Sequence, residues 1–393
     1  MTYGPIMAAG PHKGFGAYIH WPYCARICPY CDFNVYKAKG REPQPLLDAM
    51  LEDLRWHKSL LPDHPPLDSV YFGGGTPSLL SASQLDQLLS SCQALFGLRS
   101  NAEVTLEANP NDIERAPIAD WQAVGINRLS IGVQSLQDDA LSFLGRDHSA
   151  AQARSALEKA AAVFDNLSAD MIYARPGQQI KDWETELTEL LSFGIKHISL
   201  YELTISPNTA FGKAEARGQL SAMPEDDQAQ IYERTEDIMT DAGLPAYEVS
   251  NYARSSEFFG RHNQIYWASG DWIGIGPGAH GRVTTSIGRF ATHALKRPRD
   301  YTGSAMNGAS RFETQDKLSA EAIATEALSM GLRPVSGVER PPIEDLLGRK
   351  LNEEQLDLMI SDGYMTETAN KLALTASGRL LADHITNLIL STS

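Results

Sequence analysis

Short apolar runs alternate with longer amphipathic stretches along the first two hundred residues of the chain. Leu47, Met50 and Leu54 recur at helical spacing, whereas the run 69–72 is short and rich in β-branched and aromatic residues. By these criteria we expect strands at 17–20, 69–72, 102–106, 128–133, 167–173 and 197–203, separated by helices such as 46–61, 83–96, 151–164 and 181–193.

Strands that alternate with helices in this way form a parallel sheet with right-handed crossover connections. The pattern gives six βα units, which are too few for a closed eight-stranded barrel. We therefore predict an α/β fold built on a partial (β/α)6 barrel. Because ligands gather at the carboxyl ends of parallel strands, side chains at those ends are the candidate site residues.

The pattern changes after residue 290. Helical stretches at 317–332 and 352–362 are followed by a hairpin pattern near 364–375 and by a last helix at 377–390. This order resembles a winged-helix-type α+β domain. Winged helices often bind DNA, but no basic stripe is present, so a cover for the substrate or an interaction surface is favoured. We expect a leader at 1–16, the barrel at 17–290 and this accessory domain at 291–393.

The formal net charge of −15 disfavours broad electrostatic attraction to nucleic acid, and we expect no nucleic-acid partner. No apolar run approaches the about 20 residues that a membrane-spanning helix needs. Residues 1–16 are rich in Gly, Pro and Ala and lack a long apolar run, so they predict a mobile leader and not a signal peptide. A cytoplasmic protein is the expectation.

Three of the four cysteines, Cys24, Cys28 and Cys31, lie in the pattern CxxxCxxC. Three thiolates in one small volume suit three irons of a 4Fe-4S cubane and leave the fourth iron without a protein ligand. A zinc site would need a fourth Cys or His at ligand spacing, and none follows closely. A disulfide is disfavoured because three is odd and Cys92 is remote, on the apolar face of the helix at 83–96. The pattern predicts an iron–sulfur cluster in a reducing compartment.

Polar residues follow several of the predicted strands. The turn 73–77, Gly-Gly-Gly-Thr-Pro, ends the second strand, although a tight turn needs glycine in any case. Glu107 ends the third strand, and Gln134, Arg146 and Asp170 occupy comparable places on later units. Each residue alone is more often a solvated polar side chain or a cap. Together they predict a polar ring around one cavity, able to bind ribose hydroxyls or an ammonium group.

The cysteine spacing, with aromatic Tyr30 immediately before the third cysteine, resembles the radical S-adenosylmethionine superfamily. This resemblance implies that S-adenosylmethionine chelates the open iron and that an electron from the cluster cleaves it. Residues 18–24, 71–78, 130–135, 247–253 and 274–281 resemble the family of oxygen-independent coproporphyrinogen III oxidase and its haem-chaperone paralogue. By that resemblance the residues that contact S-adenosylmethionine are Tyr18, Tyr30, Gly74, Gly75, Thr76, Glu107, Gln134, Arg146 and Asp170.

One segment departs from the family pattern. Where the family usually has Ile-Tyr-Gly-Leu-Pro-Gly, this chain has Ile-Tyr-Ala-Arg-Pro-Gly at 172–177. Arg175 therefore places a charge where an apolar residue is usual, and no detailed position of the cofactor follows from the resemblance at this segment.

Two features separate the branches of the family. The oxidase branch has a fourth cysteine two positions after the third, where this chain has Phe33, as the chaperone branch does. The chaperone branch also has a His-Asn-x-x-Tyr-Trp motif, which is present at 262–267. An imidazole can be an axial haem ligand, so His262 is the candidate haem residue, with a structural hydrogen-bonding role as the alternative. His280 is a weaker candidate.

The leading hypothesis is a haem chaperone that keeps the cluster and S-adenosylmethionine. The resemblance implies haem delivery to respiratory haem proteins at the membrane surface, and a homodimer. The alternative is the oxidase itself, which converts two propionate groups of coproporphyrinogen III to vinyl groups, and a radical enzyme with another substrate is a third reading. The sequence leaves open whether the chain is an enzyme.

Overall fold

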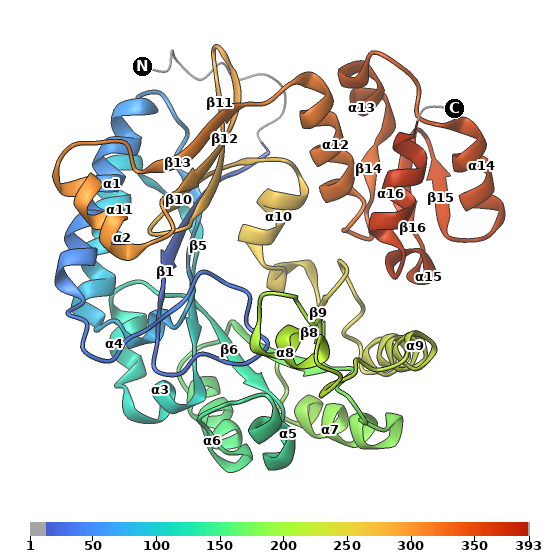
Figure 1. Ribbon diagram of the computed structural model, residues 1–393, viewed down its shortest axis with the longest axis horizontal. Coiled ribbons are helices and arrows are strands. Elements are labelled where there is room, and N and C mark those ends of the chain that lie inside the picture. Colours follow the sequence, from blue (N-terminus) through green and yellow to red (C-terminus); the bar gives the residue numbers. More distant parts are fainter. Residues whose placement is uncertain (1–12, 392–393) are drawn as a thin grey trace.

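A single large sheet runs through most of the molecule in the computed structural model, which describes residues 13–391 (Figure 1). All six predicted strands are present and pair in parallel, in chain order, which confirms the core of the prediction. They are β1 (Phe15–Trp21), β4 (Leu67–Gly74), β5 (Leu98–Ala108), β6 (Arg128–Gln134), β7 (Leu167–Tyr173) and β8 (His197–Glu202). The leader expected at 1–16 lies outside the described residues up to residue 12, and its last two residues belong to β1.

Amphipathic helices cover the outer side of this parallel sheet (Figure 1). Two of them, α2 and α6, begin with a capping box in which a serine hydroxyl and a glutamine side chain satisfy free backbone N–H groups. The helices of this layer are α1 (Gln44–Leu60), α2 (Ala82–Phe96), α3 (Pro110–Arg115), α4 (Ile118–Ala123), α5 (Asp138–Phe143), α6 (Ala150–Ala161) and α7 (Ile180–Ser192). Cys92 on α2 is fully buried in the core, as expected.

The sheet continues beyond the predicted strands at both edges. β10 (Asp271–Ile275) pairs in parallel with β1, and three antiparallel strands extend from it. These are β11 (His280–Thr285), β12 (Gly288–Ala294) and β13 (Phe312–Lys317), with α11 (Pro298–Met306) between the last two. The expected domain division at residue 291 therefore falls inside β12, and the sheet places the end of this unit after Lys317. β9 (Asn251–Ala253) closes the other edge, antiparallel to β8.

The C-terminal unit has a hydrophobic core of its own, built from 14 buried residues between Ala324 and Ile389. It contains the predicted hairpin, as β15 (Met365–Thr368) and β16 (Lys371–Leu374), and a helix and a short strand that were not predicted. Its elements are α12 (Ala320–Gly331), β14 (Val338–Glu339), α13 (Arg340–Leu347), α14 (Glu353–Ser361), the hairpin, α15 (Ala376–Arg379) and α16 (Ala382–Leu390). Within residues 13–391, no helix combines the length and apolar character that crossing a membrane requires.

Long connections between β8 and β10 carry α8 (Ala210–Glu215), α9 (Glu225–Asp241) and α10 (Arg261–Trp267). The side chain of Arg379 on α15 holds the C-terminal unit against α9, where it bonds to the Glu236 carboxylate and to the Tyr232 hydroxyl. The described chain thus folds as an open barrel with its C-terminal unit beside α9 and α10 (Figure 1).

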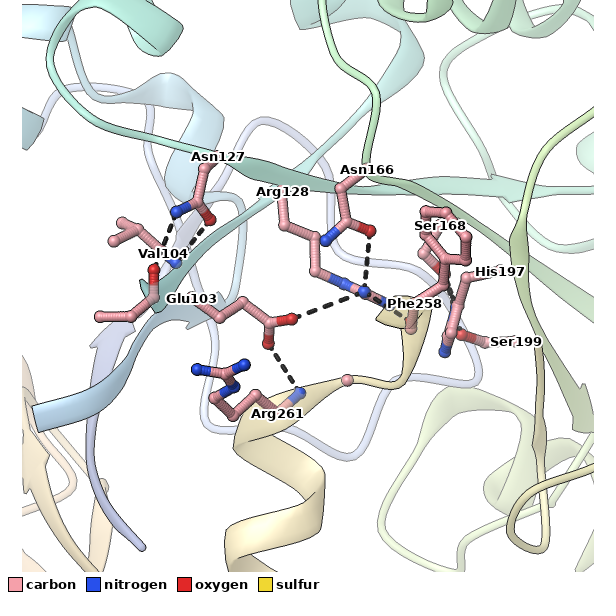
Figure 2. A network of polar contacts seen from close by, with 12 residues as sticks. Glu103, Val104, Asn127, Arg128, Asn166, Ser168, His197, Ser199, Phe258 and Arg261 are labelled. Carbon is pink, nitrogen blue, oxygen red and sulfur yellow. Dashed lines mark hydrogen bonds and ion pairs between the residues drawn. The ribbon is translucent and has the colours of Figure 1, made fainter. Parts of the chain in front are cut away.

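A buried polar network ties α10 to the amino ends of the barrel strands (Figure 2). Arg128, at the start of β6, donates to the Asn166 side chain at 3.0 Å and to the Phe258 carbonyl at 2.9 Å. It also lies 3.5 Å from the carboxylate of Glu103, which accepts the backbone N–H of Arg261 at 2.9 Å. Because each buried charge here has partners, the network can close this end of the barrel without an unpaired ion.

Candidate functional site

The carboxyl ends of the barrel strands surround a cavity of about 390 Å³. Its size is within the range of cavities that bind small molecules. The structure brings eight of the ten predicted cofactor residues and all three predicted metal ligands to its lining. They are Cys24, Cys28, Cys31, Tyr30, Gly74, Gly75, Thr76, Glu107, Gln134, Arg146 and Asp170.

Cys24 is the last residue of the short strand β2 (Tyr23–Cys24), and Cys28 and Cys31 lie in the loop between it and β3 (Tyr36–Lys37), which together form the cysteine loop. Their thiols are free, and Arg146 Nη1 lies 3.4 Å from Cys28 Sγ. Among residues 13–391, no three His, Cys, Asp or Glu side chains converge on a point that would hold a single metal ion. A cubane differs because it binds each thiolate at a separate iron, so three cysteines spread over one cavity wall fit a cluster.

Burial raises the pKa of Cys24 to about 11 and also raises the pKa of Cys31. The protein alone therefore keeps these groups as thiols, and a bound metal has to displace the protons.

The glycine turn is shaped by its neighbours in the protein. Gly74 has a φ of +104°, and a Cβ there would lie 2.4 Å from the ring of His20. A Cβ on Gly75 would lie 2.8 Å from the carbonyl oxygen of Trp21. The backbone N–H of Thr76 donates to the Tyr23 carbonyl at 2.9 Å. The glycines thus allow the end of β4 to pack on the end of β1 and hold the turn beside the cysteine loop.

Glu107 lies at the end of β5 with its carboxylate held from two sides. The Tyr71 hydroxyl donates to Oε1 at 2.9 Å, and the backbone N–H of Gly74 donates to Oε2 at 3.1 Å. Burial raises the pKa of Glu107 from 4.5 to about 7, although both hydrogen bonds favour the ionised form. Near neutral pH this carboxyl group is therefore able both to accept and to release a proton.

Asp170, on β7, is held by hydroxyl groups. Ser130 Oγ donates to it at 2.9 Å and Ser168 Oγ at 3.3 Å, while burial raises the pKa of the carboxyl group. Ser168 also bonds to His197 Nδ1 at 2.8 Å, as part of the group drawn in Figure 2. These contacts fix the orientation of the Asp170 carboxylate toward the cavity.

Arg146 and Gln134 complete the polar wall. Arg146 donates to the Asn109 side chain and, at 3.1 Å, to the Gly132 carbonyl. Gln134 has a φ of +64°, in the left-handed region that is uncommon for residues other than glycine. Such a conformation at a cavity wall is typical of positions that the surrounding structure holds in place.

Two predicted residues do not line the cavity. Tyr18 points into the barrel interior, where its hydroxyl bonds to His20 Nδ1 at 3.1 Å. His262, which was predicted as the haem residue, is 2% exposed, with Nδ1 2.7 Å from Ser69 Oγ and Nε2 2.7 Å from the Tyr266 hydroxyl. Both ring nitrogens are occupied, and burial lowers the pKa of the imidazole to about 3. His262 thus makes the contacts of the structural alternative in this structure, and its role toward haem stays a prediction.

The structure also accounts for the segment 172–177, where the sequence departs from the family pattern. Arg175 is 4% exposed and donates to Glu186 Oε2 at 2.8 Å, and it is not among the residues that line the cavity. The carboxylate of Glu186 also accepts the backbone N–H of Leu136 at 2.7 Å. The unusual charge is thus neutralised behind the cavity wall and not presented to a ligand.

Sequence reasoning missed three residues that line the cavity or support it. Tyr71 positions Glu107, Asn109 accepts a hydrogen bond from Arg146, and Tyr201 lines the cavity at the end of β8. Each lies within a few residues of the end of a predicted strand, which is the signal that could have found them.

Comparisons with known proteins agree with this geometry. A family model described as the Radical SAM superfamily matches residues 18–190. Heme chaperone HemW of Escherichia coli strain K12 is 34% identical over 386 residues, which cover 95% of this chain and 97% of that protein. Radical S-adenosyl methionine domain-containing protein 1, mitochondrial, of Mus musculus is 35% identical over 372 residues, covering 93% of this chain and 82% of that one.

A solved structure shows the same fold. The structure described as coproporphyrinogen III oxidase (HemN) from Escherichia coli, a radical SAM enzyme, matches with a TM-score of 0.80 at 20% identity, covering 98% of this chain and 92% of that chain. Together with the cysteine loop and the cavity beside it, these findings show that the chain belongs to the radical S-adenosylmethionine superfamily and, within it, to the family of the haem chaperone HemW.

Proposed function

We propose that this protein is a haem chaperone that holds a 4Fe-4S cluster and S-adenosylmethionine in the cavity and delivers haem to respiratory haem proteins. Membership of the radical S-adenosylmethionine superfamily implies both cofactors. The observation that carries the choice of branch is Phe33 in the place of the fourth cysteine of the oxidase, in a chain similar to haem chaperones over nearly its whole length.

The cysteine loop supplies the cluster ligands in this proposal. Cys24, Cys28 and Cys31 each hold one iron, and the fourth iron is left for the cofactor. When bound, the cluster supplies electron transfer to S-adenosylmethionine. Arg146 places a positive charge 3.4 Å from Cys28 Sγ, at the wall where the cluster would be held.

The remaining polar residues orient the cofactor. Glu107 and Asp170 accept hydrogen bonds from its ammonium or ribose groups, and their fixed carboxylates reduce the entropy that is lost on binding. The other proposed contacts are Tyr30, Gly74, Gly75, Thr76, Gln134 and Arg146. Tyr18, which does not line the cavity, supports these residues through its hydrogen bond to His20.

Delivery requires a protein acceptor, and we propose a respiratory haem protein at a membrane surface, with the chaperone acting as a homodimer. The support is the similarity to relatives named haem chaperones. Crosslinking of the haem-loaded protein to respiratory membranes, followed by identification of the partner, tests the acceptor, and light scattering tests the dimer.

The decisive experiment uses anaerobically reconstituted protein. We expect it to bind haem with a shifted Soret absorption and to form no protoporphyrinogen from coproporphyrinogen III, S-adenosylmethionine and a reductant. Robust decarboxylation would reject the chaperone proposal in favour of the oxidase.

A matched pair of cysteine variants tests the cluster. Cys28→Ala removes a ligand from the cavity and should abolish cluster absorbance, whereas Cys92→Ala removes a buried cysteine of the core and should keep it. Retention of the full iron and sulfide content in Cys28→Ala would contradict the assignment.

A further inference from the structure

Six exposed cations lie on two segments that meet beside the cysteine loop. The segment 37–42 runs from the end of β3 toward α1, and the segment 296–300 leads into α11. Each segment carries three cations and one carboxylate, although the whole chain has a net charge of −15. Within residues 13–391, none of the six cations forms an ion pair with a carboxylate. They are Lys37, Lys39, Arg41, Lys296, Arg297 and Arg299, and we call them the basic patch.

Tyr36 joins the two segments into one surface. Its hydroxyl donates to the carbonyl of Lys296 at 3.2 Å, and the Asn34 side chain donates to the same carbonyl at 2.8 Å. The guanidinium of Arg41 lies 5.8 Å from the centroid of the Tyr36 ring. Burial raises the pKa of the Tyr36 hydroxyl, and the charges of Arg297 and Arg41 oppose this rise, so both lie near it. The neighbouring helices α1 and α11 also pack side by side (Figure 1).

The basic patch is next to a predicted cluster ligand but outside the cavity. Strand β3 pairs in parallel with β2, with Lys37 opposite Cys24, and the backbone N–H of Ala38 donates to the Cys24 carbonyl at 2.8 Å. Paired strands lie about 4.8 Å apart. Cys24 lines the cavity, whereas no residue of 37–42 or 296–300 does. A protein on the basic patch would therefore lie one strand away from Cys24 without entering the cavity.

The basic patch fits an acidic protein better than a lipid surface. No large apolar side chain stands exposed in 37–42 or 296–300, and attachment to a membrane surface draws on such side chains besides basic ones. A chain with a net charge of −15 repels acidic proteins over most of its surface. A local excess of cations therefore selects the orientation in which an acidic protein can approach.

We propose that the basic patch docks an acidic electron-donor protein, which delivers single electrons to the cluster from the side of Cys24. This site deepens the proposed function and rests on it, because that function needs an electron at the cluster. The donor is a protein with a low-potential one-electron group such as a reduced flavin. In each encounter the donor loses one electron and the cluster gains it, while no covalent bond of this chain forms or breaks.

Titration of the anaerobically reconstituted full-length protein with a flavodoxin, an acidic flavin protein, tests docking by calorimetry. At low ionic strength, we expect the double variant Lys39→Glu with Arg299→Glu to raise the Kd about tenfold, a difference of about 1.4 kcal/mol. The matched control, Lys181→Glu with Arg254→Glu, changes the net charge equally at exposed positions on α7 and after β9, and should bind as the parent does. Raising the ionic strength to about 0.15 M should weaken binding by the parent and reduce the difference, because the Debye length falls to about 8 Å.

A second measurement follows reduction of the cluster by the loss of its visible absorbance. The patch variant should be reduced about tenfold more slowly than the parent by the reduced flavodoxin at low ionic strength, a loss of about 1.4 kcal/mol in the same terms. Photoreduced deazariboflavin, a small reductant, should reduce both at the same rate, since it needs no docking surface. The conservative pair Lys39→Arg with Arg299→Lys should behave as the parent does.

Equal Kd values for the patch variant and the parent, equal losses in the patch and control variants, or slower reduction by both reductants would each overturn the docking site. Loss of binding to phosphatidylserine vesicles with unchanged binding of flavodoxin would assign the basic patch to a membrane surface instead. Failure of the parent to take up a cluster or to bind haem would reject the proposed function, whereas a parent that does both and ignores the patch reversal rejects the docking site alone.

Discussion

Glu107→Gln replaces a buried carboxyl group whose pKa lies at about 7 by a neutral amide of the same shape. The raised pKa means that the folded protein keeps a proton that the unfolded chain has already lost at neutral pH. The contribution of Glu107 to the free energy of unfolding is therefore highest below about pH 4.5 and decreases as the pH rises through 7. The variant no longer has this dependence.

The magnitude follows from the two pKa values. At about 1.36 kcal/mol per pKa unit, the different proton binding of Glu107 in the folded and unfolded chain lowers the free energy of unfolding of the parent, relative to its value at low pH, by about 3 kcal/mol at pH 8.5 and about 1 kcal/mol at pH 5.5. The amide cannot accept the Gly74 N–H and the Tyr71 hydroxyl together, and a lost hydrogen bond costs about 1 kcal/mol. The variant should match the parent at pH 5.5 and exceed its free energy of unfolding by about 2 kcal/mol at pH 8.5.

Urea unfolding of the reduced, cluster-free protein at pH 5.5, 7.0 and 8.5 measures these differences. Glu158→Gln is the control, since Glu158 lies exposed on α6, and its difference from the parent should not vary with pH. If the difference between Glu107→Gln and the parent is the same at all three pH values, the argument from burial is refuted.

Two other buried groups give predictions of different kinds. Arg175→Leu leaves the Glu186 carboxylate buried without its cation and should lower the free energy of unfolding by about 3 kcal/mol, as measured with urea, while adding Glu186→Gln should restore part of it. Full stability of the single variant would contradict the pairing. His262→Ala removes a ring that bonds to Ser69 and Tyr266 and should destabilise by about 3 kcal/mol. In an anaerobic haem titration its folded fraction should bind haem with a Kd within twofold of the parent, and loss of haem binding would support His262 as the ligand.

Local periodicity was sufficient to predict the six parallel strands of the barrel, but it did not predict the strands that extend the sheet at its two edges. The strands β4 to β8 are short apolar runs beside amphipathic helices, and each pattern can be read within a few residues. β11 to β13 follow no such rhythm, because antiparallel edge strands such as β13, with polar residues at 313–317, lack a continuous apolar run. The misplaced boundary at residue 291 has the same cause.

Site residues could be predicted where their position at the end of a strand determines that they face the cavity. Strand ends bring Glu107 and Asp170 to one cavity regardless of side-chain detail. The location of His262 depends on how α10 enters the barrel, which is set by long-range contacts such as that between Arg261 and Glu103. A motif read along the chain does not contain that information.

The place of β1 between β4 and β10 has a consequence for synthesis of the chain. β1 stays without its second neighbour until residues 271–275 have been synthesised, about 250 residues later. Until then β1, which leads into the cysteine loop, can pair only with β4. We therefore expect a truncated chain that ends before β10 to be a poor acceptor of iron and sulfide.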